Sequence, residues 1–283
     1  MSNNISCYIW GAGGGGLRIY NTVKDNYNIL GFVDSDTQKW GTQTVDGLKI
    51  SDPNILKTAE YEKIILGTMM GINEVPKILE NMGLSKDLLI TEYASLSVNA
   101  RRLFLKRISE MINGKDLEGA VAEVGVYKGE FAKEINYFFE NRKCFLFDTF
   151  EGFDERDFSY EAEKSLIKSE HFKQTAPELV LGKMPYKENI VIKKGYFPDT
   201  VEGIEDNFVF VNLDCDLYKP TLEGLRYFWN RMPVGGCILI HDYFGEGFPN
   251  VKKAVSDFQM EIGLELACLP VGDDLSIAIY KYC

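Results

Sequence analysis

Short apolar runs that end in a glycine or an acid recur along the chain, and a helical pattern follows most of them. Runs such as CYIWG, CFLFD and FVFVNLD have the length of strands, and the intervening stretches carry apolar residues at helical spacing. Strands that alternate with helices predict parallel pairing, because each return to the same end of a sheet needs a crossover. The sequence therefore predicts an α/β fold with mostly parallel sheets.

This alternation occurs in two successive series. Residues 1–94 are expected to form a small Rossmann-like domain and residues 95–283 a second, larger one, which suits a chain of 283 residues. A helix predicted over residues 95–114 begins the second series. The runs LELACLP and SIAIYKY close it as an antiparallel hairpin, a known addition to an open parallel sheet.

Charge and composition exclude several classes of function. The formal net charge is −11, so the surface would repel a polyanion, and a nucleic-acid partner is not expected. No apolar stretch reaches the roughly 18 to 20 residues that span a bilayer, and the first residues lack a signal-peptide pattern. We therefore expect a cytoplasmic protein without a membrane segment. The oligomeric state is left open, a homo-oligomer included.

The run GAGGGG follows the first predicted strand. Gly11 and Gly13 begin a G-x-G-x-x-G pattern, and Asp34 ends the next strand at about the spacing of a ribose-binding acid in dinucleotide-binding units. Such glycines let a pyrophosphate approach a helix N-terminus. A tight turn without any ligand explains the same glycines, so both interpretations stay open. The segment also resembles the small nucleotide-binding domains attached to sugar acetyltransferases, which implies a nucleotide or nucleotide-sugar ligand.

A second glycine turn, AEVGVYKG, places an acid before its glycines. Glu123 precedes Gly125 and Gly129 at the end of a predicted strand, and Asp148 ends the next one. The glycines would leave room for a cofactor, the Glu123 carboxylate would face a positive group, and Asp148 can accept two ribose hydroxyls. Solvated loop carboxylates are the alternative, although ligands of α/β sheets bind at the carboxyl ends of strands.

Two later strands end in candidate metal ligands. Asp214 and Asp216 follow the strand FVFVNL, and His241 and Asp242 follow ILI. Carboxylates and an imidazole at one sheet edge predict a divalent ion, which would lower the pKa of a substrate hydroxyl. If Asp214 points into the crevice, Asp216 lies beyond the strand in a loop or helix start, so only one of the two is expected to be a direct ligand. His241 has three open roles: metal ligand, general base or packing residue.

The second half of the chain resembles the macrocin O-methyltransferase family. The resemblance covers roughly residues 96–283 and rests on AEVGVYKGEFA, LFDTFEGF, KKGYFPDTV and LDCDLYKPTLEGLRYFWNRMPVGGCILIHDYF. It implies a class I methyltransferase fold, S-adenosylmethionine as methyl donor and magnesium-assisted O-methylation of a sugar hydroxyl. The positions that match its cofactor residues are Glu123, Gly125, Tyr127, Gly129 and Asp148. Those that match its metal residues are Asp214, also implied as the base, and Asp242.

Two features depart from that family. Many members have Asp-Asp-Tyr where this chain has His241-Asp242-Tyr243, and imidazole favours manganese, iron or zinc over magnesium. The family also lacks, as a rule, an extra N-terminal domain. Two other functions stay open: a nicotinamide-dependent oxidoreductase that uses GAGGGG, and a non-catalytic nucleotide-sensing module. The oxidoreductase hypothesis leaves the second glycine turn unexplained.

Residues 151–189 form a polar stretch that contains His171, the only histidine besides His241. This stretch is longer than an ordinary connection. A lid over the substrate and an exposed helical insertion are both compatible with its length. His171 is expected on the surface or in such a lid.

Overall fold

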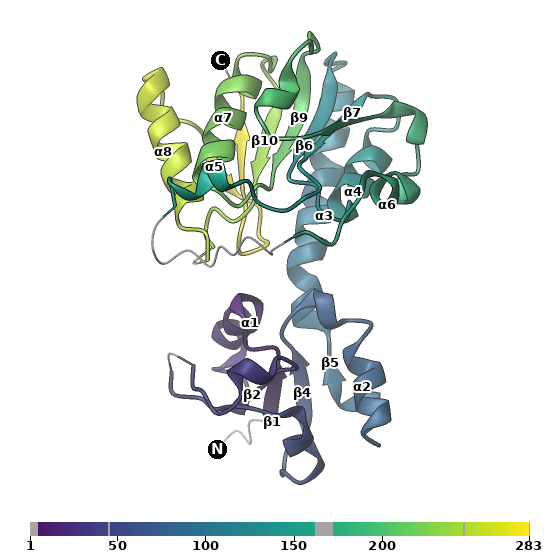
Figure 1. The fold of residues 1–283 in the computed structure, drawn as a ribbon, viewed down its shortest axis with the longest axis vertical. Helices are drawn as coiled ribbons and strands as arrows, with labels where there is room; N and C mark the ends of the chain where they lie inside the picture. Colours follow the sequence, from purple (N-terminus) through teal and green to yellow (C-terminus); the bar gives the residue numbers. More distant parts are fainter. Residues whose placement is uncertain (1–4, 45, 162–171, 246, 283) are drawn as a thin grey trace. The chain divides into compact units, whose positions relative to one another are not determined.

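The computed structural model describes residues 5–44, 46–161, 172–245 and 247–282. The chain forms two compact units, residues 1–99 and 100–283 (Figure 1). This boundary lies inside helix α3 (Glu92–Gly114), as does the boundary predicted after residue 94. Within the described ranges, no helix is both long and apolar enough to cross a membrane.

The first unit contains a parallel five-stranded sheet with the order β3-β2-β1-β4-β5. This is the order of the first five strands of a doubly wound dinucleotide-binding sheet. Apolar side chains fill both of its faces, with Phe32 and Ile65 on one side and Leu66 and Leu79 on the other. Its elements are β1 (Ser6–Trp10), α1 (Gly14–Val23), β2 (Asn28–Val33), β3 (Ile50–Ser51), β4 (Lys63–Leu66), α2 (Val75–Asn81) and β5 (Leu89–Ile90).

The second unit contains a seven-stranded sheet with the order β11-β12-β10-β9-β6-β7-β8. Five neighbouring strands are parallel, and β12 runs antiparallel to both β10 and β11. The predicted C-terminal hairpin is therefore confirmed. The strands are β6 (Ala120–Val124), β7 (Cys144–Asp148), β8 (Ile190–Lys194), β9 (Phe208–Leu213), β10 (Cys237–Ile240), β11 (Cys268–Pro270) and β12 (Ile277–Tyr280).

Helices cover both faces of this second sheet (Figure 1). Helices α7 (Tyr218–Trp229) and α8 (Asn250–Ile262) bury Phe228 and Phe258 on one face. Helices α3, α4 (Glu130–Phe138) and α6 (Pro177–Lys183) bury Leu105, Ile135 and Val180 on the other. Each fully buried side chain of this size contributes roughly 1.5 to 3 kcal/mol. These two cores fix the strand ends that carry the polar residues described below.

Three elements of the structure differ from what the local sequence patterns predict. The run DLLITEY has the pattern of a strand through Tyr93, but β5 ends at Ile90 and Glu92 already begins α3. The helix after the first strand begins earlier than predicted, at Gly14 inside the glycine run. Helix α8 was not predicted at all, although its buried Val251, Ala254, Val255 and Phe258 have helical spacing.

The polar stretch after β7 contains two short described helices, α5 (Glu155–Phe158) and α6. His171 lies outside the described residues, so its predicted surface position is untested. The remaining short elements are 3-10 helices at Thr37–Lys39, Pro53–Lys57, Met69–Gly71, Lys86–Leu88, Lys187–Asn189 and Asp199–Val201.

Candidate active site

Two loops leave the carboxyl edge of the second sheet at its switch point, between β6 and β9 (Figure 1). The strands that follow β6 and β9 lie on opposite sides of this point, a geometry that opens a crevice in α/β sheets. Gly125 lies where the loops are closest: its φ is +84°, and a Cβ there would lie 2.0 Å from the carbonyl oxygen of Asp214. The sequence interpretation assigned this glycine to cofactor access. The structure shows that the chain's own packing already requires it.

Gly129 has a similar explanation. Its φ is +76°, and a Cβ would lie 2.9 Å from Cγ1 of Val180 on α6. The predicted cofactor role of this glycine is therefore not needed to account for it. Close packing of the turn therefore accounts for both glycines.

Asp148 closes the glycine turn that follows β6. Its Oδ2 accepts hydrogen bonds from the backbone N–H groups of Val126 (2.7 Å) and Tyr127 (2.8 Å), and its Oδ1 accepts one from Phe150 (2.6 Å). The predicted ribose contact would have to use the lone pairs that remain. Tyr127 and Phe150 have φ values of 47° and 56°. Non-glycine residues rarely adopt such conformations, and they cluster at functional sites.

Glu123 lies inside the sheet, whereas the sequence predicted that its carboxylate would face a positive group of a ligand. The residue is 1% exposed, and its Oε1 accepts a hydrogen bond from Nδ2 of Asn212 on β9 at 2.7 Å. Its Oε2 has no partner among the described residues. Burial, reinforced by the nearby Asp214 carboxylate, raises the pKa of Glu123 to about 8. In this structure the carboxyl group accepts a hydrogen bond from an amide, and the charge of Arg101 partly offsets the rise in its pKa.

Arg101 connects this buried amide to Asp214. Its Nη2 donates to Oδ1 of Asn212 and to Oδ2 of Asp214, both at 2.9 Å, and its guanidinium lies 3.9 Å from the centroid of the Phe131 ring. Sequence reasoning missed Arg101 and Asn212. Asn212 was recognisable as an amide in the apolar run FVFVNLD. Arg101 gave no signal, because it precedes Asn212 by 111 residues.

His241 lies between two carboxylates. Its Nδ1 is 2.6 Å from Oδ2 of Asp242 and 3.2 Å from Oδ1 of Asp214. One ligand atom from each of these three residues lies within 4.8 Å of the others. The structure thus brings the three predicted metal ligands together, and their chemistry fits a divalent ion. Two carboxylates with one imidazole suit manganese, iron or zinc better than magnesium.

Neighbouring charges set the protonation of this cluster. Burial alone would lower the pKa of His241, but the carboxylates of Asp214 and Asp242 outweigh it and raise that pKa to about 10. Burial would raise the pKa of Asp214, but His241 and Arg101 hold it well below its usual range. Without a metal, the cluster at neutral pH is an imidazolium between carboxylates. A metal that binds His241 there must displace a proton.

Asp216 also belongs to this cluster, and it lies in the loop beyond the end of β9, as expected. Asp216 and Asp242 have φ values of 60° and 56°. Burial first, and then the Asp242 and Asp214 carboxylates, raise the pKa of Asp216 well above its ordinary value. The compact set of three ligand atoms contains Asp214 and not Asp216. That only one of this pair is a direct ligand stays a prediction.

The glycine turn of the first unit is closed in the same way. Oδ2 of Asp34 accepts hydrogen bonds from the Ala12 N–H (2.8 Å) and from Nζ of Lys39 (2.9 Å). Burial would raise the pKa of Asp34, but these donors lower it. Gly11 has a φ of +106°, whereas an added Cβ on Gly13 would meet no atom within 4 Å. Packing therefore does not require Gly13, and Asp34 is already engaged.

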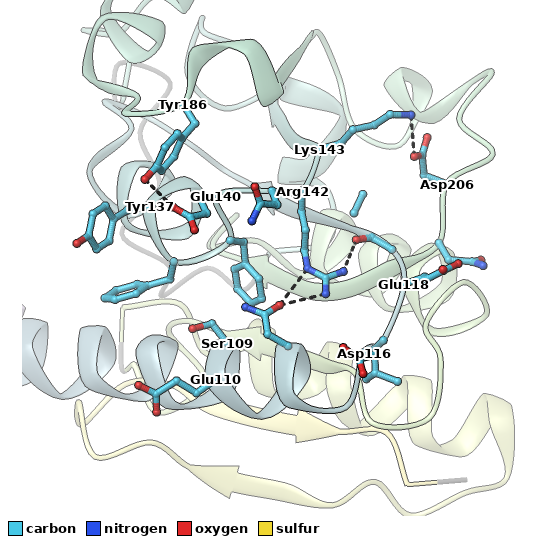
Figure 2. Close-up of a pocket in the computed structure, with 18 of the residues that line it drawn as sticks. Ser109, Glu110, Asp116, Glu118, Tyr137, Glu140, Arg142, Lys143, Tyr186 and Asp206 are labelled. Atoms are coloured by element: carbon cyan, nitrogen blue, oxygen red, sulfur yellow. Dashed lines mark hydrogen bonds and ion pairs between the residues drawn. The ribbon is translucent and has the colours of Figure 1, made fainter.

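Figure 2 shows a pocket in the second unit, which has a volume of about 1070 Å³ and is not lined by Asp148, Asp214, His241 or Asp242. The C-terminal parts of α3 and α4 and the starts of β6 and β7 line it, so it lies at the amino edge of the sheet. Its polar groups pair with each other: Arg142 donates to the carbonyl of Gly119 at 2.8 Å, and Lys143 pairs with Asp206. Because ligands of open α/β sheets bind at the carboxyl edge, this pocket is not the candidate active site.

Comparison with known proteins decides the family. A model of the macrocin O-methyltransferase (TylF) family matches residues 91–273 of the 283. The chain belongs to the macrocin O-methyltransferase family. It is therefore an O-methyltransferase, the class of enzyme that the sequence predicted. A second family model, described as C2185-like, N-terminal, matches residues 3–90.

Two solved structures of methyltransferases resemble the chain at low sequence identity. The O-methyltransferase NovP has a TM-score of 0.57 and 18% identity, over 65% of this chain and 80% of its own. CalS11, a calicheamicin methyltransferase, has a TM-score of 0.53 and 15% identity, over 75% of this chain and 86% of its own. These likenesses show the fold, and the predicted class I methyltransferase fold is confirmed. No curated protein matches the chain.

Proposed function

We propose that this enzyme transfers the methyl group of S-adenosylmethionine to a hydroxyl of a sugar, in a glycosylated small molecule or a nucleotide-sugar. The proposal rests above all on the switch point of the second sheet. The glycine turn after β6 and the cluster of Asp214, His241 and Asp242 meet there, as a cofactor site and an acceptor site must in a direct transfer. The sugar acceptor is what membership of the macrocin O-methyltransferase family suggests.

The proposed reaction is a displacement at the sulfonium methyl carbon. The acceptor oxygen forms a bond to this carbon while the carbon–sulfur bond breaks, and the hydroxyl proton passes to a base. Asp214 is the proposed base and metal ligand, but a carboxylate with a strongly lowered pKa is a weak proton acceptor. Its larger contribution is therefore positioning, which alone supplies several kcal/mol in such reactions.

The predicted divalent metal remains part of the proposal. Asp214, His241 and Asp242 would hold it, and a bound ion would lower the pKa of the acceptor hydroxyl. His241 is proposed as the third ligand, with base and packing residue as its other roles. Because His241 carries a proton in the metal-free cluster, we expect metal binding to strengthen as pH rises.

Calorimetry on the full chain tests the cofactor. S-adenosylmethionine and S-adenosylhomocysteine should bind with and without EDTA. NAD should not bind to the second unit. Asp214→Asn should abolish methyl transfer to a sugar panel while leaving S-adenosylhomocysteine affinity within about threefold. Binding of NAD alone would favour the oxidoreductase. Cofactor binding without transfer to any acceptor would favour the non-catalytic module.

For the first unit we propose a phosphate-bearing nucleotide at the start of α1. This helix has no side-chain cap and no acid in its first turn, and Gly13 faces open space. The backbone of Gly13 is extended, so Gly13→Asp fits there and would cap the helix. The variant should keep or gain thermal stability while losing UDP or NAD in equilibrium dialysis, because its carboxylate repels phosphate. Equal nucleotide binding by parent and variant would show that the turn is purely structural.

A further inference from the structure

The residues around α5 are held against the start of α7, directly beyond the carboxyl end of β9. The N–H of Tyr218 donates to Oε1 of Glu161 at 2.7 Å, across 57 residues of sequence. Nδ2 of Asn250, at the start of α8, donates to Oε2 of Glu161 and to the carbonyl of Tyr160, both at 3.1 Å. Residues 160–161 are therefore fixed next to the loop that carries Asp214.

Two features of this place suit a sugar ring. The ring of Tyr160 is stacked on that of Tyr218, with centroids 6.0 Å apart and an angle of 18° between the planes. Tyr160 is nevertheless 49% exposed. A ring that is fixed on one side and open on the other offers an apolar platform with little loss of entropy on binding.

Lys219 supplies a positive charge beside this platform. Its Nζ lies 5.4 Å from the Tyr160 ring centroid and 5.2 Å from that of Tyr196. Tyr196 is held in turn by its hydroxyl, which donates to Oδ1 of Asp157 at 2.6 Å. The ammonium group thus rests on two rings whose positions are fixed by other contacts.

Lys219 differs from two nearby cationic residues, because each of them forms an ion pair with a carboxylate. Arg156 pairs with Asp154 and Asp199, and Lys253 pairs with Asp257. Within the described ranges, no carboxylate forms an ion pair with Lys219, in a chain that has 42 acidic and 31 basic residues. The carboxylates of Asp154 and Asp157 act on Lys219 only from beyond ion-pair distance, so its ammonium can still form a direct contact with an anionic group of a ligand.

We propose that Tyr160 and Lys219 form a subsite for the acceptor, in which the Tyr160 ring takes one face of a sugar and Lys219 binds an anionic oxygen group that the acceptor carries. A phosphate and a carboxylate share this chemistry. The inference rests on the proposed sugar methylation and adds the charge of the acceptor. It places the acceptor over the start of α7, five positions along the chain from Asp214.

Calorimetric titration of the full chain, loaded with S-adenosylhomocysteine, tests the subsite. The probes are glucose 1-phosphate, glucuronate and methyl glucoside, which carry a phosphate, a carboxylate and no charge. Lys219→Met should weaken the two anionic probes by about tenfold and leave the neutral probe unchanged, since one charge-assisted contact is lost. Lys219→Arg should retain most of the affinity. Lys143→Met, which removes an exposed ion pair with Asp206 at the amino edge of the sheet, is the control and should change nothing.

The arms of this test separate the outcomes. A larger effect on glucose 1-phosphate than on glucuronate identifies phosphate as the preferred group, and the reverse identifies a carboxylate. Equal binding of all three probes by the parent, or undiminished anionic binding by Lys219→Met, overturns the subsite. Absence of binding by both anionic probes overturns it as well. Failure of the proposed function is distinct, because it is seen either as no S-adenosylhomocysteine binding in the loading step or as no methyl transfer by the parent, whichever probes bind.

Discussion

Replacing Arg101 by methionine removes the guanidinium that holds Asp214 and Asn212 while keeping much of the side-chain volume. Arg101 is 12% exposed and Asp214 22%, so the variant leaves a largely buried carboxylate without one of its two cationic neighbours. Breaking a buried ion pair by removing one partner costs about 3 to 5 kcal/mol. His241 still faces Asp214 at 3.2 Å. Because this second cation remains, we expect a loss at or below the lower end of that range, about 2 to 3 kcal/mol.

Arg102→Met is the matched control, because the adjacent arginine has the same kinds of partner on the surface. Its Nε pairs with Glu134 at 2.7 Å, and its guanidinium lies 5.1 Å from the ring centroid of Phe138, but its side chain is 46% exposed. Exposed pairs of this kind contribute about 0.2 to 1 kcal/mol. The two substitutions thus differ mainly in burial and in the connection to Asp214.

Native-state hydrogen exchange followed by mass spectrometry is the assay, since it reads each unit separately. Peptides from β6 and β9 should lose about 2 to 3 kcal/mol of protection in Arg101→Met and under 1 kcal/mol in Arg102→Met. Peptides from β1 should be unchanged in both. Adding Asp214→Asn to Arg101→Met should recover part of the loss, because no charge is then left unpaired. Equal losses in the two arginine variants would refute the reasoning.

Three further predictions follow from burial, packing and charge. Glu123 has a folded-state pKa of about 8, above that of an ordinary carboxyl, so its contribution to stability is lost as pH rises toward 8. In urea unfolding, the free energy of unfolding of Glu123→Gln should therefore rise relative to that of the parent between pH 5 and pH 8. A constant difference between the two would contradict this. Gly125→Ala should cost about 3 kcal/mol or more, because its Cβ meets the Asp214 carbonyl, whereas Gly182→Ala, where a Cβ meets nothing within 4 Å, should be neutral or stabilising. Thermal melts compare the two, and similar effects would exclude the clash. Finally, calorimetry should show manganese binding more tightly than magnesium, with affinity rising about tenfold per pH unit below the pKa of His241, and a flat pH profile would exclude His241 as a ligand.

The order of strands and helices was largely readable because apolar runs and helical spacing are local signals. The two units, the parallel sheets and the C-terminal hairpin all came from such patterns. The errors lie where local patterns compete. The run that ends in Glu92 and Tyr93 has a strand pattern, but these two residues begin α3, because local propensity is a weak guide where a strand and a long helix meet.

The candidate site was readable only in part, for a different reason. Asp148, Asp214, His241 and Asp242 stand at strand ends, where sequence position alone predicts a common edge. Arg101 comes from a helix on one face of the sheet, and nothing local to it indicates Asp214 as its partner. Asp216 lies in the loop beyond β9, as predicted, but its interactions with Asp242 and Asp214 gave no sequence signal, because its φ is positive and the backbone there is no longer extended.

The two glycine turns show what such motifs report. In each unit the acid that ends the second strand accepts a hydrogen bond from the turn after the first: Asp34 from Ala12, and Asp148 from Val126 and Tyr127. The glycine and acid spacing is therefore already explained by a closed turn, with or without a ligand. What distinguishes the second unit is the cluster at the ends of β9 and β10. Its four ionisable groups shift one another's pKa values; they are Asp214, Asp216, His241 and Asp242. Catalytic chemistry is thus better inferred from that cluster than from either glycine motif.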